Sequence, residues 1–179
     1  GDLWTCRPDG TNATRVTNTG TTERHPSFSP DGERLCFHLD EAELDSGEIG
    51  TVATDGSGWA LLTSGVNASS TAWSPLGGEI AYHEVLDQDT EDKALFFANA
   101  TSGAVTAVDL EGDEDWADSW PAWSPDGTQI VFVREDMLAG ASRGVDLWIV
   151  EREDLTELEQ LTETPGVHKS TPALALIHL

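Results

Sequence analysis

Four carboxylates stand close together in a stretch of the sequence that contains no basic residue. They are Asp113, Glu114, Asp115 and Asp118, within residues 109–120. Hard cations such as calcium are bound by several carboxylate oxygens that converge at about 2.3–2.6 Å. The segment therefore predicts a calcium site, with a solvated acidic rim as the alternative in a chain this acidic. Residues 87–91 also alternate carboxylates but lack the glycine of a calcium-loop turn.

Two tryptophans, Trp116 and Trp120, lie among these acids. Amphipathic aromatic side chains anchor protein interfaces and sugar-stacking surfaces, so the pair predicts a binding rim. The alternative is a structural role, because Trp73 and Trp123 occupy a core position that recurs in the repeats described below, where Phe28 is the third copy.

One segment has the pattern of a hydrolase nucleophile. Gly140-Ala-Ser-Arg-Gly144 matches Gly-x-Ser-x-Gly, but that motif needs a strand, a sharp turn and a helix, and here it lies between two predicted strands. We interpret it as a chance match. The sequence has no His-Glu-x-x-His motif, no phosphate-binding glycine loop and no zinc spacing at Cys6 and Cys36. It therefore predicts no catalytic residue, no enzyme activity and no required cofactor.

Three of the four asparagines stand in acceptor sequons for N-glycosylation: Asn12, Asn67 and Asn99. All three lie in predicted turns, where a glycan has room. The sequons favour a chain outside the cytoplasm, whether periplasmic, on the cell surface or secreted. The alternative is the usual role of asparagine as a turn residue.

The strands and turns that carry these residues are predicted from an internal sequence repeat. Its first unit contains Ser-Pro-x-Gly and occurs at residues 26–37, 71–82 and 121–132. The turn prolines of the three copies, Pro30, Pro75 and Pro125, are 45 and then 50 residues apart. A second unit occurs at 2–17 and 48–63, offset by 46 residues, with looser copies at 94–108 and 146–162. Periods of this length are typical of solenoids and propellers.

Each unit predicts a β-hairpin. In Ser-Pro-Asp-Gly the proline presets φ for a type I turn, and the glycine takes the left-handed conformation that returns the chain. The residues that follow alternate in polarity with the period of a strand, as at Ile80 and Tyr82. Two hairpins per period make a four-stranded antiparallel sheet, and stacking such sheets around an axis gives a β-propeller.

The Ser-Pro-x-Gly segments, each followed by a Leu-Trp or Ile-like strand and a closing Leu-Thr, resemble the repeats of TolB-type propellers, which are similar to WD-repeat proteins. The predicted fold is an all-β propeller of four-stranded antiparallel blades, a single module over residues 1–179. Blades are predicted at 26–63, 71–108 and 121–162, and half-blades at 2–17 and 170–179. Joined half-blades would close a ring of about four blades. The alternative is a portion of a larger ring of roughly six to eight blades, since TolB-type propellers usually have six.

Histidines also recur at one position of the repeat: His38, His83 and His178. This position lies on the second strand of a blade, one strand away from the predicted channel. We therefore interpret the histidines as structural residues inherited with the repeat, and not as a metal-binding ring.

The charge of the chain excludes several classes of partner. Nine Lys and Arg against 33 Asp and Glu give a formal net charge of −24. Such a field repels nucleic-acid phosphates and anionic membrane surfaces, and no apolar run long enough to span a membrane is present. The acidic, lysine-poor composition is typical of a halophilic surface, with an ordinary acidic secreted protein as the alternative.

Fold and charge together predict a non-catalytic binding or scaffold propeller that meets a protein partner or surface polymer at the cell envelope or outside the cell, as the TolB resemblance implies. One alternative is an accessory, substrate-gating propeller of a larger peptidase or hydrolase. Another is a structural subunit of an extracellular assembly, with open strand edges paired to a neighbouring chain. A closed ring predicts a monomer, whereas an open arc predicts edge pairing.

Overall fold

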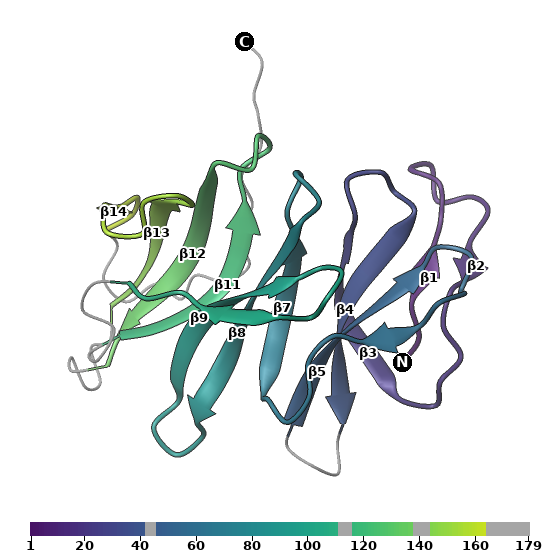
Figure 1. Ribbon diagram of the computed structural model, residues 1–179, viewed down its shortest axis with the longest axis horizontal. Coiled ribbons are helices and arrows are strands. Elements are labelled where there is room, and N and C mark those ends of the chain that lie inside the picture. The colour runs from purple at the N-terminus through teal and green to yellow at the C-terminus, as the bar shows by residue number, and fades with distance from the viewer. Residues whose placement is uncertain (42–45, 111–115, 138–143, 164–179) are drawn as a thin grey trace.

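The computed structural model describes residues 1–41, 46–110, 116–137 and 144–163. These ranges form β-strands and contain no helix. Figure 1 shows twisted sheets that follow one another along the chain, with β1 and β2 at one side of the molecule and β13 and β14 at the other. The predicted all-β fold of antiparallel, four-stranded blades is confirmed.

The N-terminal sheet has two strands, β1 (Trp4–Thr5) and β2 (Thr14–Arg15), and is called the half-blade below. Blade 1 consists of β3 (Thr22–Phe28), β4 (Arg34–Glu41), β5 (Ser46–Ala53) and β6 (Ala60–Leu61). Blade 2 consists of β7 (Ala68–Trp73), β8 (Glu79–Asp87), β9 (Asp92–Asn99) and β10 (Val105–Ala107). Blade 3 consists of β11 (Trp116–Trp123), β12 (Gln129–Asp136), β13 (Val145–Glu151) and β14 (Leu158–Gln160). The half-blade predicted at 170–179 lies outside the described residues.

The Ser-Pro-Asp-Gly segments form the turns between the first two strands of a blade. In blade 1, Ser29 Oγ donates to Asp31 Oδ1 at 2.6 Å, and the backbone N–H of Glu33 donates to the same oxygen at 3.0 Å. Ser124 and Asp126 repeat the hydroxyl bond at 2.6 Å in blade 3. Because these contacts are local, the turn fixes the register of the two strands that it joins.

Neighbouring blades pack through an aromatic residue at the end of each innermost strand. Trp73 of blade 2 joins a core cluster that includes Cys36 of blade 1. Trp123 of blade 3 lies against Phe97 of blade 2, with ring centroids 5.7 Å apart, and donates its Nε1–H to the carbonyl of Ala72 at 3.1 Å. Both tryptophans are 8% exposed, so each contact closes one face of a blade against the previous blade.

Phe28 occupies the equivalent position in blade 1, but the half-blade provides only outer strands to cover it. Leu3 and Val16 of the half-blade pack with Leu35 and Phe37 over the outer part of blade 1. Phe28 itself is 55% exposed. Within the described residues, the N-terminal side of blade 1 is therefore only half covered.

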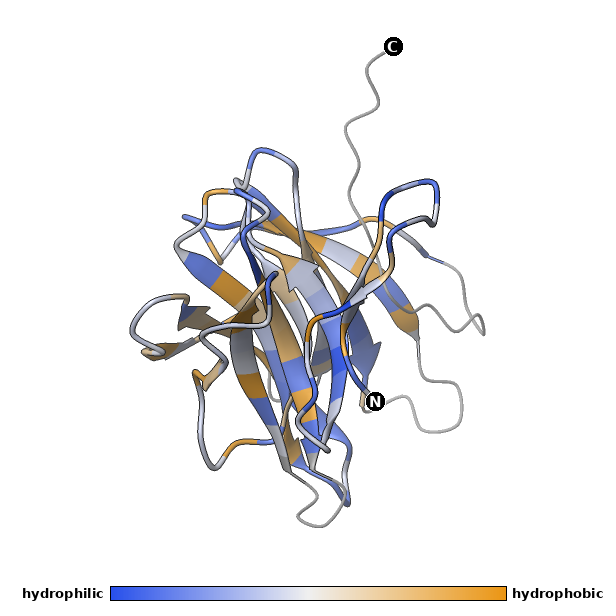
Figure 2. Ribbon diagram, turned by 90° about the vertical axis from the view of Figure 1, so that its right-hand side faces the viewer, coloured by the Kyte–Doolittle hydropathy of each residue, from blue (hydrophilic) through white to orange (hydrophobic). Residues whose placement is uncertain are grey.

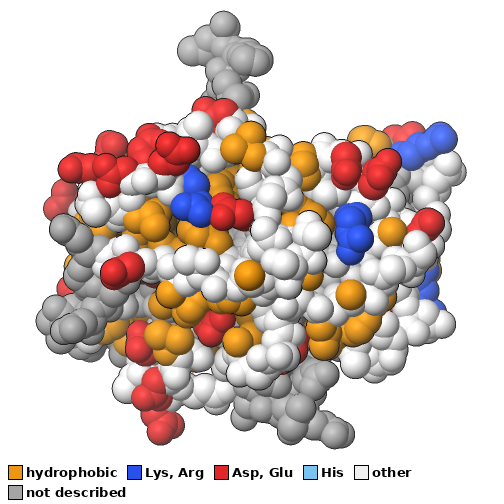
Figure 3. Space-filling model, viewed as in Figure 1, with side chains coloured by type: hydrophobic (Ala, Val, Ile, Leu, Met, Phe, Trp, Pro, Cys, Tyr) orange, Lys and Arg blue, Asp and Glu red, His pale blue; other side chains and the backbone are white. Residues whose placement is uncertain are grey.

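The distribution of side chains agrees with this layered packing. Figure 2 shows hydrophobic and hydrophilic residues interspersed along the strands, as the two-residue period of a sheet requires. Figure 3 shows acidic side chains gathered along part of one face and few basic ones among them. No helix among the described residues is long and apolar enough to cross a membrane.

Candidate functional site

One irregularity recurs at the same place in all three blades. The strands β3, β7 and β11 each shift register in their pairing with the second strand of the blade. At each shift stands a non-glycine residue with positive φ: His25 (48°), Ser70 (55°) and Trp120 (55°). Such a conformation costs on the order of 1–3 kcal/mol, and strained residues of this kind gather at functional sites. A bulge also changes the direction of its side chain.

The bulge residues His25 and Trp120 contact two histidines of the second strands, His38 and His83. We call these four residues, with Ser70 at the equivalent bulge of blade 2, the axial cluster. The His25 and His38 rings are stacked, with centroids 5.9 Å apart. Trp120 reaches across from blade 3, so that its ring lies 5.1 Å from His25 of blade 1 and 6.0 Å from His83 of blade 2. The backbone N–H of Trp120 also donates to His83 Nδ1 at 3.5 Å, a long bond.

Burial favours the neutral form of the three imidazoles. His83 is 4% exposed, and desolvation lowers its pKa to about 3. Desolvation and the neighbouring His25 lower the pKa of His38 to about 4, and desolvation lowers the pKa of His25 as well. At neutral pH the rings are therefore uncharged.

Three polar atoms of the cluster are buried without a hydrogen-bond partner: His25 Nδ1, His38 Nδ1 and Ser70 Oγ. Leaving a buried polar group unpaired costs about 1–3 kcal/mol, so folded chains keep few of them. Unpaired atoms and strained backbone at the same place make the axial cluster the candidate functional site.

The cluster is not arranged as a metal centre. In the part of the chain that the structure describes, no three His, Cys, Asp or Glu side chains are grouped as ligands for one ion. What the cluster presents is a set of rings, of which His25, His38 and Trp120 are partly exposed. Such rings can stack against apolar or planar groups of a partner.

The sequence analysis identified Trp120 as a candidate binding residue and interpreted its neighbour His83 as structural. His38 and His83 lie on the second strands of blades 1 and 2, where the sequence analysis expected them, and they contact the bulge residues His25 and Trp120 respectively. His178 lies outside the described residues. His25 and Ser70 were not identified as candidates. The sequence did contain a signal for them, because His25, Ser70 and Trp120 each stand directly before a copy of the repeated segment.

The other predicted rim residues of this segment lie within blade 3. Arg134 donates from Nε and Nη2 to the two carboxylate oxygens of Asp118, both at 2.8 Å, and both side chains are at most 3% exposed. The Arg134 guanidinium also lies 5.5 Å from the centroid of the Trp116 ring. Asp118 and Trp116 thus take part in a buried ion pair and a cation–π contact. Residues 113–115 lie outside the described residues, and the calcium site stays a prediction.

The three sequon asparagines differ in accessibility. Asn12 and Asn99 are exposed, whereas Asn67 is partly buried. The Oδ1 atom of Asn99 accepts bonds from the backbone N–H groups of Thr101 and Ser102, at 3.0 and 2.8 Å, which is the local turn role of asparagine. Glycosylation stays a prediction at all three positions.

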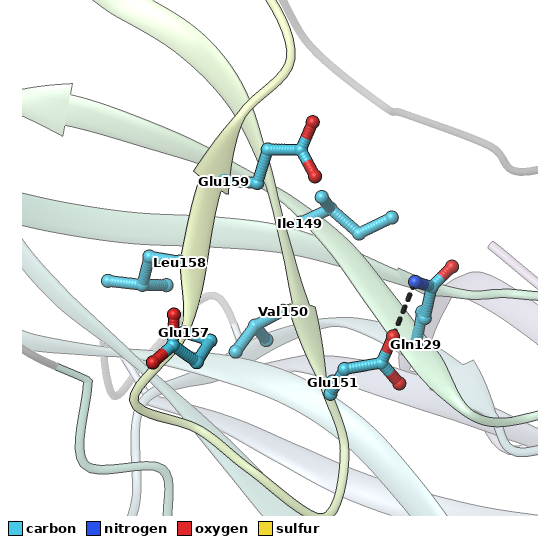
Figure 4. Close-up of a pocket in the computed structure, with 7 residues that line it drawn as sticks. All are labelled: Gln129, Ile149, Val150, Glu151, Glu157, Leu158 and Glu159. Atoms are coloured by element: carbon cyan, nitrogen blue, oxygen red, sulfur yellow. Dashed lines mark hydrogen bonds between the residues drawn. The ribbon is translucent and has the colours of Figure 1, made fainter.

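An open pocket of about 230 Å³ lies at the outer strands of blade 3. Figure 4 shows the seven residues that line it and the bond that Gln129 donates to Glu151, at 2.7 Å. Three of the seven are glutamates, and none is Ser, Cys or His, so the pocket lining provides no pair of nucleophile and imidazole base. Most of the Gly-x-Ser-x-Gly segment lies outside the described residues.

Comparison with known proteins places this geometry in a fold family. No protein-family model and no curated protein matches the sequence. TolB from Acinetobacter baumannii is similar in structure, with a TM-score of 0.64 and 20% identity over 88% of this chain and 36% of TolB. An oligogalacturonate lyase from Vibrio parahaemolyticus is also similar, with a TM-score of 0.63 and 17% identity over 90% of this chain and 46% of the lyase. A prolyl endopeptidase is similar as well, with a TM-score of 0.61 and 15% identity over 88% of this chain and 25% of the peptidase.

The chain spans less than half of the length of each of these three proteins. At identities of 20% or below, the similarity concerns the fold and not the activity. The repeats, the three four-stranded blades and the match to TolB together show that this chain has the fold of a TolB-type β-propeller.

Proposed function

We propose that the chain is part of a non-catalytic binding propeller that engages a protein partner at the axial cluster, outside the cytoplasm. The observation that carries this proposal is the cluster itself. Three blades each contribute one strained bulge residue, and the His25 and Trp120 rings are partly exposed there. Rigidly held aromatic side chains make good anchors, because binding restricts few rotamers.

The net charge of the chain supports a protein partner, and the exposure of two sequon asparagines supports a compartment outside the cytoplasm. A net charge of −24 favours a partner with a neutral or basic surface and disfavours nucleic acid. The sequon residues Asn12 and Asn99 are exposed and accessible to glycosylation in an extracytoplasmic compartment. A surface polymer is the second class of ligand, because sugars stack on indole rings.

A specific observation favours structural assembly as a second candidate function. Phe28 is 55% exposed and Trp4 of the half-blade is 60% exposed. In the described part of the chain, β1 pairs with β2 alone, so the opposite edge of β1 has no strand beside it. Exposed aromatic residues and an open strand edge suit β-strand addition by a neighbouring chain.

The similarity to a prolyl endopeptidase supports a third candidate, a propeller that gates substrate entry in a longer hydrolase. In that case the chemistry would reside in another domain of the parent protein. Peptidase activity of the full-length protein is the measurement that would favour this candidate over the first.

The binding proposal is tested by capture with two variants that alter different surfaces. The immobilised chain is incubated with an envelope extract of its source cells in about 1 M salt, where exposed charges are screened. The proposal predicts a specific protein, identified by mass spectrometry, that is retained by the wild type and by the control Phe28→Ser. Trp120→Ala should reduce its retention about tenfold or more, as expected for loss of one anchor. Retention that fails with Phe28→Ser and survives Trp120→Ala would contradict the proposal and favour structural assembly.

A further inference from the structure

The axial cluster concentrates imidazoles where three blades meet. His25 and His38 belong to blade 1, His83 belongs to blade 2, and Trp120 of blade 3 contacts both groups. Histidine is the side chain whose charge changes in the mildly acidic range, so the contact between blades depends on groups that can be charged by acid.

Protonation would remove the features that hold Trp120 in place. His83 Nδ1 accepts the backbone N–H of Trp120, and a protonated Nδ1 cannot accept a hydrogen bond. The stacked His25 and His38 rings, 5.9 Å apart, would repel each other if both were charged. Their Nδ1 atoms are buried without a partner, so an added proton at either atom would find no acceptor in the present arrangement.

The carboxylates of the surrounding strands are already engaged. On β4, Asp40 pairs with Arg24 of β3 at 3.0 Å. On β5, Glu48 accepts a bond from Thr63 Oγ1 at 2.9 Å. Two further carboxylates accept hydroxyl bonds, Glu23 on β3 from Thr17 and Glu84 on β8 from Tyr82, and Asp118 on β11 forms an ion pair with Arg134.

The nearby cations oppose protonation. Arg24 acts against the charged forms of His25 and His38, and Lys93 on β9 acts against the charged form of His83. Asp40 favours the charged form of His38, but desolvation outweighs it. The environment therefore stabilises the neutral cluster and provides little compensation for the charged one.

We propose that the axial cluster is an acid-sensitive latch, in which protonation of His25, His38 and His83 separates Trp120 from the histidine rings and releases the inner strand of blade 3 from blade 1. The blades themselves stay folded, because the strand ladders that contain His38 and His83 are joined by backbone hydrogen bonds, which protonation of an imidazole does not remove. The Trp73 and Trp123 contacts between blades involve none of these histidines. The inference concerns the fold and holds whichever partner the propeller binds.

The pKa values of the three histidines determine the pH range in which the latch opens. The histidines have lower pKa values in the folded chain than the ordinary value near 6.5, so the latch is closed above that pH. It opens as the pH falls toward about 4 for His38 and about 3 for His83.

The test is an acid titration of the whole chain in about 1 M salt, from roughly pH 8 to pH 3. Near-UV circular dichroism reports the tryptophan surroundings and far-UV circular dichroism reports the sheets. NMR of the imidazole Cε1–H groups and the tryptophan Nε1–H groups assigns the protonation events. The latch predicts a reversible near-UV change at higher pH than the far-UV loss, accompanied by titration of the three cluster histidines and a shift of the Trp120 signal.

The double variant His38→Gln/His83→Gln should lose this near-UV change or move it by one pH unit or more. The matched control His168→Gln/His178→Gln replaces the other two histidines and should keep it. Coincident near-UV and far-UV transitions in the wild type, or an unchanged transition in the first double variant, would overturn the latch. If that variant does not fold, the wild-type NMR decides, because cluster histidines that titrate without a shift of the Trp120 signal also overturn it.

Discussion

The incomplete cover of blade 1 predicts that three equivalent aromatic residues differ in their contribution to stability. Phe28, Trp73 and Trp123 end the innermost strands of the three blades. Trp73 and Trp123 are 8% exposed, whereas Phe28 is 55% exposed. Truncation to alanine should therefore destabilise the chain strongly in blades 2 and 3 and weakly in blade 1.

The magnitudes follow from the buried areas. A buried tryptophan removes on the order of 200 Å² from water, which at about 25 cal/mol per Å² is about 5 kcal/mol, or about 3–4 kcal/mol after allowance for a compact unfolded state. Trp123→Ala also removes the bond to the Ala72 carbonyl, which adds about 1 kcal/mol. Phe28 has less than half of its surface buried, so Phe28→Ala should cost about 1–2 kcal/mol.

Urea denaturation followed by far-UV circular dichroism in about 1 M salt measures these differences as shifts in the unfolding midpoint. Trp73→Ala serves as the matched control, since it should behave like Trp123→Ala. Phe28→Trp should be nearly neutral because the site is open. A cost for Phe28→Ala within about 1 kcal/mol of that for Trp123→Ala would refute the reasoning, because Phe28 would then be covered in solution by another segment or chain.

Four further outcomes are expected. Arg134→Met should cost about 3–5 kcal/mol in urea denaturation, because it leaves Asp118 buried without its ion pair, and a simultaneous Asp118→Leu should recover part of this loss. Gly50→Ala should destabilise by about 1–3 kcal/mol because its Cβ would lie 2.5 Å from the Phe37 ring, whereas Gly78→Ala, with open space around it, should be nearly neutral in the same assay. As the pH falls below about 6.5, the wild type should lose stability relative to His38→Gln/His83→Gln, by at most about 1.4 kcal/mol per pH unit for each histidine, and an equal slope in both chains would contradict the cited pKa shifts. If the calcium site exists, calcium should raise the melting temperature of the wild type and leave that of Asp113→Asn/Asp115→Asn unchanged, and no response of the wild type would refute the site.

The hairpins were predictable because their causes are local in the chain. Ser29 and Asp31 stabilise a turn through contacts within a few residues, and the alternation at Ile80 and Tyr82 indicates a strand without reference to other segments. The core role of Trp73 and Trp123 was also predictable from their repeated position. Local signals and their repetition were therefore enough for the four-stranded blades.

The roles of the residues in 116–120 depended on strand pairing. Asp118 and Trp116 stand in an acidic segment and predicted a solvent-facing rim, yet the β11–β12 register places Asp118 opposite Arg134 inside the blade. Trp120, two residues further along, is at the bulge and extends instead to His25 and His83. Neither outcome can be derived from composition, because both depend on partners 16 to 95 residues away.

The sequence by itself determined the repeat, the hairpins, the TolB-like blades and the acidic surface, since each follows from local residue patterns or from a sum of charges. Only the tertiary structure decided which side chains meet in the axial cluster and which aromatic residue is left uncovered. The bulges of three separate strands direct His25, Ser70 and Trp120, and the half-blade leaves Phe28 exposed. These outcomes depend on how whole sheets are stacked, and the physical reason is that burial and contact between blades are properties of the packed chain and not of any one segment.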